Sequence, residues 1–477
     1  MGCRGGESYR GLWLAVLLTG LAGCGSPPVA DEPDRALTSE QAEEASHTPS
    51  HSPRLRWFLH PTAPGQEDSA VAVTMDRDQN TIVLFTFSTS IDLGSGPLTG
   101  PGTDHPGVFR RKLAVAKFRP DGRLLWARAF AAVSAGSSSS TILRSRALAV
   151  DRRGDIVLVG STSEPTDFGG GLLPPGNFLL KLDSGRGRHV WSRALPPAAF
   201  NAIAVDRQDH ISLAGSFSGT MDFGSGPISS KPTPDPDEPE SSAFIASYTS
   251  EGRFLWVWAN VTEPGDVRAL TVDSQDHLLA AVTVGSVEGV AIIRVSPTGN
   301  LLWDRRPGIH GNPTSIATHG NRVVATGRFL DGFTFAGQPF STENIDAFVI
   351  AYTRSGEERW ARTLGIEGTG VAMDQRDGVL ITGAFAPGDD LGLGSPRATG
   401  GTYVSRLDRI SGEVQWVRTL EGGGSNGIAV TRDGRRITVV GVFSGPFDFG
   451  AGPLMPENID PFVVQFGVSL SEPSLFE

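Results

Sequence analysis

Short runs in which apolar and polar residues alternate recur along most of the chain, and alternation with a period of two predicts half-buried β-strands. One such run returns seven times, at residues 71–76, 147–151, 202–206, 269–273, 315–318, 371–374 and 427–431. The copies are separated by roughly 45 to 75 residues, a spacing that is typical of repeat proteins whose unit is a small sheet. The pattern therefore predicts an all-β repeat protein rather than a helical solenoid.

The third copy shows how one repeat begins. Residues 202–206 predict a strand, residues 207–210 a tight turn and residues 211–217 a returning strand. The same turn recurs at residues 151–155, 273–277, 374–378 and 431–434. Asp and Gly in these turns supply side-chain to backbone hydrogen bonds and positive φ angles. A calcium loop is the alternative, but an EF-hand needs about twelve residues ending in a bidentate Glu, which these turns lack, so the pattern favours turns.

A glycine-rich motif follows the hairpin in most repeats. It is clearest at residues 92–97, 167–171, 222–227 and 448–453, and looser at residues 334–337 and 390–394. Three copies contain Asp-Phe-Gly, a triplet also found in protein kinases, yet the other kinase motifs are missing. Because the motif occurs once per repeat, we expect a structural loop with a buried Phe or Leu and glycines that permit the turn.

Each repeat continues with a third strand and a fourth that carries tryptophan. The tryptophans, each a short distance after a turn glycine, are at positions 126, 191, 256, 303, 360 and 416. Four strands per repeat match one blade of a β-propeller. The last repeat stops at its third strand, near Phe466, while residues 54–57 resemble the fourth strand at residues 123–126. We therefore predict a seven-bladed β-propeller of four-stranded blades over residues 54–468, with residues 54–60 completing the last blade and removing an open edge, and a C-terminal tail at 469–477.

The first residues indicate export. Arg4 and Arg10 precede an apolar run at residues 12–21 that is too short to span a bilayer. The run ends in Leu21-Ala22-Gly23-Cys24, which resembles the lipobox of bacterial lipoproteins. The resemblance implies that residues 1–23 are a lipoprotein signal peptide and that Cys24 carries lipid, including palmitate. An ordinary secretory signal with an incidental cysteine is the alternative.

Residues 24–53 are poor in apolar residues and rich in Pro, Ser and acid, which predicts a lipidated, disordered tether. Gly25 after the modified cysteine resembles the pattern of lipoproteins sorted to the outer membrane of Gram-negative bacteria. We therefore expect a cell-envelope protein that is anchored by lipid in a membrane, and we expect this membrane to be the outer membrane. Cys3 leaves with the signal peptide, so the mature chain can form no internal disulfide.

The repeats resemble bacterial β-propeller repeat families typified by Ala-Val-Asp and Asp-Phe-Gly-x-Gly segments, over about residues 54–468. The fourth repeat departs from the pattern because residues 282–290 are too short for the glycine motif, and the fifth has Thr318 in place of the strand-ending Asp. The tryptophan strands, clearest at residues 407–416, also resemble the docking strands of quinoprotein-type propellers. That resemblance implies tryptophans that hold neighbouring blades together, and the family includes both dehydrogenases and non-catalytic outer-membrane assembly lipoproteins.

No motif supports a catalytic, cofactor-binding or metal-ligating residue, so Cys24 is the single predicted site residue and no cofactor is expected. The histidines are scattered, and His47 and His51 of the tether lack further ligands. The formal charge of -11 argues against nucleic acid as a partner. Propeller loops often carry binding groups, and the longest connections are residues 98–107, 131–143 and 228–242.

The sequence thus favours a cell-envelope lipoprotein, attached to the membrane through lipid on Cys24, whose propeller is a non-catalytic binding or scaffolding module. An envelope protein or a glycan is the expected partner. Two alternatives stay open. One is a quinoprotein-like or other propeller enzyme whose site is assembled from loops, and the other is an assembly factor for outer-membrane proteins.

Overall fold

The alternating runs form strands throughout. The computed structural model describes residues 53–468, apart from 62–67, 101–109, 133–140, 232–239, 286–287, 377, 394–398, 450–451 and 457. All of them belong to one unit, Ser50–Glu477, and the described residues form β-strands and no helix, which confirms the all-β prediction. Within this part of the chain there is accordingly no helix long and apolar enough to cross a membrane. The predicted signal peptide, the tether with Cys24 except for Pro53, and the C-terminal tail lie outside the described residues.

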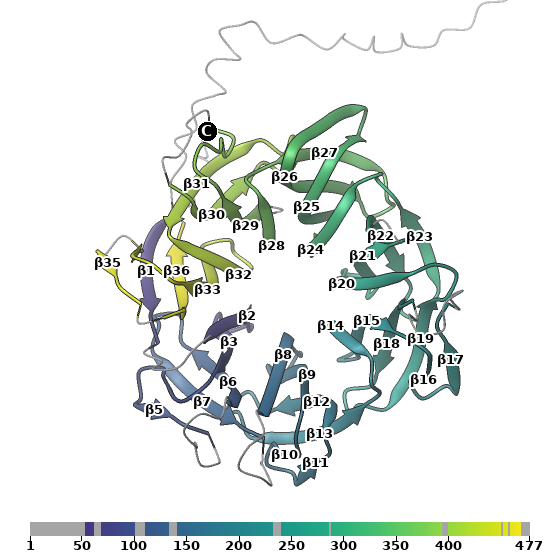
Figure 1. Ribbon diagram of the computed structural model, residues 1–477, viewed down its shortest axis with the longest axis vertical. Coiled ribbons are helices and arrows are strands. Elements are labelled where there is room, and N and C mark those ends of the chain that lie inside the picture. The colour runs from purple at the N-terminus through teal and green to yellow at the C-terminus, as the bar shows by residue number, and fades with distance from the viewer. Residues whose placement is uncertain are drawn as a thin grey trace, which may run out of the picture. The chain divides into compact units, whose positions relative to one another are not determined.

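The main strands build sheets of four and of eight strands, in which every pair is antiparallel except β6 with β8. Each eight-stranded sheet divides into two groups of four at a short bridge. The bridge between β6 and β8 consists of the pairs Arg110–Thr141 and Arg111–Ile142, and the bridge between β22 and β24 of the single pair Gly289–His310. Every described four-stranded group is named here after the member that lies nearest the centre in Figure 1.

The groups and their strands are the β2 group (β2 Ser69–Met75, β3 Thr81–Phe87, β6 Arg110–Phe118, β7 Leu124–Phe130), the β8 group (β8 Thr141–Val150, β9 Ile156–Thr162, β12 Gly176–Leu182, β13 His189–Leu195), the β14 group (β14 Ala199–Val205, β15 Ile211–Phe217, β18 Ser242–Tyr248, β19 Phe254–Asn260), the β20 group (β20 Gly265–Val272, β21 Leu278–Val284, β22 Gly289–Val295, β23 Leu301–Arg305), the β24 group (β24 His310–His319, β25 Arg322–Phe335, β26 Gln338–Thr353, β27 Glu358–Thr363), the β28 group (β28 Glu367–Met373, β29 Val379–Phe385, β30 Gly401–Leu407, β31 Val414–Glu421) and the β32 group (β32 Gly423–Val430, β33 Arg436–Phe443, β36 Asp460–Gly467, β1 Arg54–Leu59).

Figure 1 shows the groups placed around a common centre, with the naming strand of each innermost. Each innermost strand contacts that of the next group, from β2 through β8, β14, β20, β24, β28 and β32, and β32 contacts β2 in turn. The second and third strands carry most of the core: every residue of β3, β15 and β18 is buried. Their β-branched and aromatic side chains pack against the neighbouring groups on both faces of the sheet.

The two ends of the described chain meet in the β32 group. β1 pairs antiparallel with β36, from Arg54 opposite Gly467 to Leu59 opposite Val463. The strand order is β1-β36-β33-β32. A strand from the N-terminal end therefore occupies the position that the tryptophan strand holds in the other groups, and it covers what would otherwise be an open edge of β36.

The glycine motifs form small hairpins between the second and third strands, namely β4 (Ile91–Asp92) with β5 (Pro97–Leu98), β10 (Thr166–Asp167) with β11 (Leu172–Leu173), β16 (Thr220–Asp222) with β17 (Pro227–Ser229) and β34 (Phe447–Asp448) with β35 (Pro453–Leu454). In β10–β11, Asp167 Oδ1 accepts hydrogen bonds from the N–H groups of Gly169 at 2.7 Å and Gly171 at 3.0 Å. Phe168 is 2% exposed and Phe223 is 4% exposed. The prediction of a structural loop with a buried aromatic residue is confirmed.

The β24 group differs from the expected glycine loop at residues 334–337. There β25 and β26 stay paired as one long hairpin as far as Phe335–Gln338, and the chain turns at Ala336 and Gly337, both of which have positive φ. A shift in register between Leu330 and Gly332 leaves residues 342–344 unpaired opposite Asp331, and this irregularity lets the hairpin bend.

Tryptophans of the fourth strands join neighbouring groups. The indole N–H of Trp126 donates to the carbonyl of Ser184 at 3.2 Å, and that of Trp191 donates to the carbonyl of Ser250 at 3.1 Å. The equivalent bonds run from Trp256 to Pro297, from Trp303 to Arg354 and from Trp360 to Arg409. Each acceptor lies in the turn before the tryptophan strand of the next group, so the docking role implied by the quinoprotein resemblance is confirmed for these residues.

Candidate functional site

Four of the innermost strands end in buried ion pairs. The Asp that ends the strand meets a cation from the third strand of its group, Asp76 with Lys117 at 2.9 Å and Asp151 with Lys181 at 2.7 Å. Two further pairs follow the same rule, namely Asp273–Arg294 at 2.6 Å and Asp374–Arg406 at 3.0 Å. Because an unpaired buried charge costs several kcal/mol, these carboxylates are stabilised by their partners and brace the hairpin turns.

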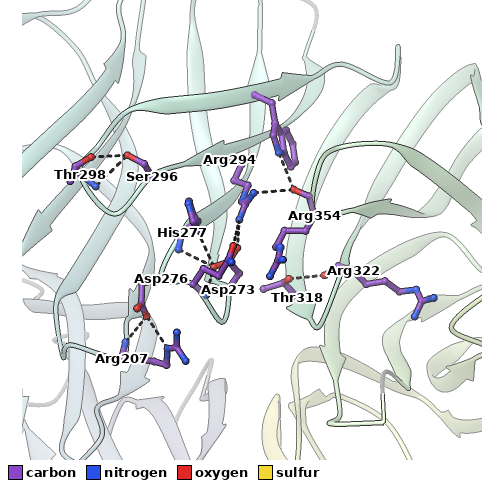
Figure 2. Close-up of polar contacts among 12 residues, drawn as sticks. Arg207, Asp273, Asp276, His277, Arg294, Ser296, Thr298, Thr318, Arg322 and Arg354 are labelled. Atoms are coloured by element: carbon purple, nitrogen blue, oxygen red, sulfur yellow. Dashed lines mark hydrogen bonds and ion pairs between the residues drawn. The ribbon is translucent and has the colours of Figure 1, made fainter.

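The Asp residues also organise the turns themselves. Asp273 Oδ1 accepts the N–H groups of Gln275 at 2.8 Å and His277 at 3.0 Å. Figure 2 shows its carboxylate held between this turn and Arg294, whose guanidinium also reaches the Arg354 carbonyl. Burial raises the pKa of Asp273, but the backbone hydrogen bonds and Arg294 outweigh it and hold the pKa below its usual value. These contacts confirm the prediction of turn chemistry.

An arginine follows the strand-ending residue in several groups. Arg77, Arg152, Arg207 and Arg432, which together we call the arginine rim, directly follow Asp76, Asp151, Asp206 and Thr431, and all four are exposed. They line one cavity of about 340 Å³, together with Gln79, Gln375 and Asp433. The rim thus gathers residues that are up to 355 positions apart in the sequence, counted from Arg77 to Arg432.

Hydrogen bonds between successive turns hold the rim in place. Arg152 donates from its backbone N–H to Asp209 Oδ1 at 2.9 Å and from Nη1 to the Arg207 carbonyl at 2.7 Å. Arg207 in turn donates from N–H and Nε to Asp276 Oδ1 at 3.0 and 3.4 Å, as Figure 2 shows. On the other side, the Gln375 N–H donates to the Arg432 carbonyl at 2.9 Å. The turns therefore form a preorganised surface rather than independent loops.

The cavity gathers four arginines although the chain as a whole is acidic, with a formal charge of -11. Its lining contains the four rim arginines and the carboxylates of Asp76, Asp151, Asp206 and Asp433. The first two carboxylates are neutralised from behind by Lys117 and Lys181. A planar guanidinium presents several donors in a fork that suits carboxylates and phosphates, so this arrangement can hold an anionic group.

A second polar cluster lies at the opposite end of the strands, where β1 and β36 meet β2. His60 Nε2 is 2.9 Å from Asp460 Oδ2, and Asp68 Oδ1 accepts the Ser88 N–H at 2.8 Å. Burial raises the pKa of Asp68 to about 6, a rise that the Ser88 hydrogen bonds reduce and the charge of Asp460 increases. Among the residues that the structure describes, no group of three or more His, Cys, Asp or Glu side chains could hold a metal ion.

The sequence-predicted positions are only partly described. Cys24 lies outside the described residues, as do most of the connections at residues 98–107, 131–143 and 228–242. His210 lies in its predicted turn, where Nδ1 is 2.9 Å from Asp206 Oδ2. The arginine rim was missed by sequence reasoning. The signal for it was the dipeptide Asp-Arg at 76–77, 151–152 and 206–207, with Thr-Arg at 431–432.

Comparisons with known proteins define only the fold. No protein-family model matches the chain, and no curated protein matches it. Among solved structures, a chain from the crystal structure of a mitotic checkpoint complex is similar with a TM-score of 0.50 at 10% identity, covering 95% of this chain and 99% of that one. The hydrazine synthase of Kuenenia stuttgartiensis reaches a TM-score of 0.45 at 11% identity, covering 79% of this chain and 94% of that one. The fold is propeller-like.

Proposed function

We propose that the four-stranded groups are the seven blades of one β-propeller, closed by β1. The pairing of β1 with β36 supports this proposal, as does the contact between the innermost strands β2 and β32. A further support is Trp57 of β1, which lies against Gly122 of the β2 group so closely that a Cβ there would come within 2.8 Å of the indole. Trp57 would then dock the last blade on the first through ring contact, since its indole N–H has no hydrogen-bond partner among the described residues.

We further propose that this is a cell-envelope lipoprotein whose propeller is a non-catalytic binding module, and that the arginine rim takes an acidic segment of an envelope partner. The observation that carries the proposal is the grouping of four exposed arginines around one cavity in an acidic chain. Several neighbouring carboxylates already bind cations or turn N–H groups, which suits a surface that holds a ligand better than one that transfers protons.

The position of β1 supports a role close to a membrane. Arg54 pairs with Gly467, which pairs with Arg436, and Arg436 donates to Gln79 of the cavity. The chain thus enters β1 on the same end of the strands as the rim. If residues 24–53 are a flexible tether from lipidated Cys24, their r.m.s. span is about 30 Å. The rim would then meet partners at or near the membrane surface.

Charge reversal at the rim tests the binding role. Full-length protein with a C-terminal tag is isolated from gently solubilised native envelopes, and copurifying proteins are identified by mass spectrometry for the wild type and for Arg77→Glu/Arg432→Glu. We expect a stoichiometric acidic partner with the wild type and its loss with the variant. In calorimetry, a hexaglutamate peptide should bind the wild type, with an affinity that falls as salt rises because exposed charges are screened.

The matched control is Arg123→Glu/Arg359→Glu, which reverses two charges outside the rim whose side chains are 83% and 55% exposed. This control should keep both the partner and the peptide. Equal losses in the two double variants would mean that overall charge, rather than the rim, attracts the ligand. Binding that is insensitive to the rim reversal would exclude the proposed site.

A further inference from the structure

A different surface, between the β14 and β20 groups, carries an inference beyond the proposed function. In several groups an aromatic ring from the loop between the second and third strands packs on an aromatic ring of the third strand. Phe168 lies 4.5 Å from Phe178 between ring centroids, and Phe223 lies 4.5 Å from Phe244. Phe168 also lies 5.4 Å from Phe130 of the preceding group. The loop aromatic therefore fills the space between two groups.

The second strand makes room for this pair of rings. Gly160 pairs with Phe178 and Gly441 with Phe462. A Cβ on Gly160 would come within 2.6 Å of the Phe178 ring, and a Cβ on Gly441 within 2.8 Å of the Phe462 ring. The β2 group has Ala114 at the third-strand position, but its partner Phe85 supplies a ring from the second strand. Each of these groups thus fills the space with its own side chains.

The β20 group has neither ring. At the equivalent register Val282 pairs with Ala291, so the third-strand aromatic is replaced by a methyl group. The connection between β21 and β22 comprises only residues 285–288, too short to carry an Asp-Phe-Gly hairpin. A cavity of about 220 Å³ lies here, with Trp258, Val282, Ala291 and Ile293 in its lining. An apolar cavity of about 150 Å³ is large enough to bind benzene, so this one can take a ring.

The polar side chains at the edge of the cavity limit which ligands it can bind. Arg306 donates from Nη1 to Glu263 Oε2 at 3.0 Å and from Nη2 to Asp304 Oδ2 at 2.9 Å. Arg306 is thus paired with both carboxylates, and the three groups together carry one net negative charge. An anionic ligand would be repelled, whereas a neutral ligand leaves these pairs in place. Asp304 Oδ1 is buried and has no hydrogen-bond partner among the described residues. The Asp304 side chain is 29% exposed and lines the cavity, so a rotation of its carboxylate would present this oxygen to a donor group on the ligand's ring.

We propose that this cavity binds a phenolic ring, which takes the place filled in the other groups by their own aromatic side chains and donates its hydroxyl to Asp304. The ring packs against Trp258, Val282 and Ala291, and aromatic pairs of this kind are favourable beyond their buried area. The site is separate from the arginine rim, so either proposal can fail without the other.

The probe is p-cresol, titrated into the full-length protein and followed by calorimetry and by ligand-observed NMR. We expect saturable binding with one site per chain, and weaker binding of toluene, which has the same ring but no hydroxyl. N-acetyltyrosinamide distinguishes the sources of the ring. Binding of p-cresol alone indicates a free small phenol, while binding of both compounds indicates a tyrosine side chain that a partner inserts. Binding of neither compound would overturn the proposal.

Filling the cavity provides the structural test. Val282→Gly/Ala291→Phe copies the glycine and ring found at Gly160 and Phe178, and it should weaken p-cresol binding by at least about tenfold while the protein stays folded. Ala291→Val makes a smaller change and provides a test if the double variant does not fold. It should also weaken p-cresol binding. Val190→Ala, on the exposed face of β13, is the control and should bind as the wild type does. Undiminished binding in both filled variants that remain folded would refute the site.

Discussion

At the scale of single residues, the residue that ends an innermost strand predicts the charge of one residue on the third strand of the same group. Where the strand ends in Asp76, Asp151, Asp273 or Asp374, the third strand supplies a lysine or arginine. Where it ends in Thr318 or Thr431, the same position on the third strand is Ala351 or Gln465. For Asp206 the same position on the third strand is Ser247, and Asp206 pairs with His210 instead. The groups therefore rarely leave a charge without a partner beneath the turns.

This matching predicts a large coupling energy between Asp374 and Arg406. Asp374→Thr or Arg406→Ala alone should lower the free energy of unfolding by roughly 3–5 kcal/mol, because each leaves a buried group unpaired. The double variant reproduces the Thr318 and Ala351 combination of the β24 group, in which Thr318 Oγ1 donates to the Arg322 carbonyl at 2.6 Å. It should be clearly more stable than the sum of the single effects implies. Denaturant unfolding of all four proteins measures the coupling, and strict additivity would contradict it.

Asp68 predicts a stability that depends on pH. Burial raises its pKa from 3.8 to about 6, so the folded state binds the proton more tightly than the unfolded state does. The contribution of Asp68 to the free energy of unfolding therefore falls as pH rises from about 4 to about 6, by about 3 kcal/mol in total. Asp68→Asn keeps an oxygen acceptor for the Ser88 N–H and cannot ionise. The variant should exceed the wild type in stability at pH 8, and this advantage should vanish by pH 4; an advantage independent of pH would assign it to packing.

At the scale of elements, repetition made much of the fold predictable. Four features each occur several times, namely the strands, the Asp-capped hairpins, the buried Phe of the glycine motif and the docking tryptophans. Repetition distinguishes such a pattern from a chance match in the sequence. The β25–β26 hairpin was not predicted, because its strands continue through residues that resemble a degenerate glycine motif. Long-range pairing, rather than local sequence, decided that segment.

The candidate sites were harder to predict for a different reason. The arginine rim depends on bringing Arg77 and Arg432 to one cavity, which only the arrangement of the groups does. The cavity of the β20 group depends on what is missing. The short connection is visible in the sequence as a departure from the repeat, but Ala291 by itself gives no signal. Their effect follows from the register that places Ala291 where Phe178 and Phe244 stand in other groups.

In the turns that contact the docking tryptophans, replacing a glycine by alanine should lower the free energy of unfolding. Gly187 has a φ of 64°, and a Cβ there would lie 2.5 Å from the Trp126 ring. Gly219 has a φ of 73° with nothing within 4 Å of such a Cβ, so it isolates the backbone effect. Gly219→Ala should cost about 1–2 kcal/mol, and Gly187→Ala a further 1–3 kcal/mol because it displaces the tryptophan. Thermal and denaturant unfolding measure both, and equal losses would show that the tryptophan contact adds nothing.

At the scale of the whole molecule, the proposed lipid anchor makes a separate prediction. Several acyl chains hold a protein on a membrane firmly, whereas one alone gives marginal binding. Cys24→Ala should therefore move the protein from the membrane to the soluble fraction, as measured by fractionation and immunoblotting. The propeller of the released protein should keep the wild-type melting temperature, since Cys24 precedes β1 by 30 residues. Retention of the variant on membranes would show a second means of attachment.

The proposed closure of the ring by β1 predicts that the stability of the whole molecule depends on this strand. Deleting residues 54–60 removes β1, exposes the edge of β36 and takes Trp57 away from Gly122. A closed ring would then become an open array, with an expected loss of at least about 3 kcal/mol, comparable to truncating one buried tryptophan. Deleting residues 30–45 of the expected tether shortens the chain on the same side without touching a described strand, so it controls for the deletion itself. A clear fall in melting temperature for the first variant alone supports closure by β1, whereas equal melting temperatures would mean that the remaining groups are stable without it.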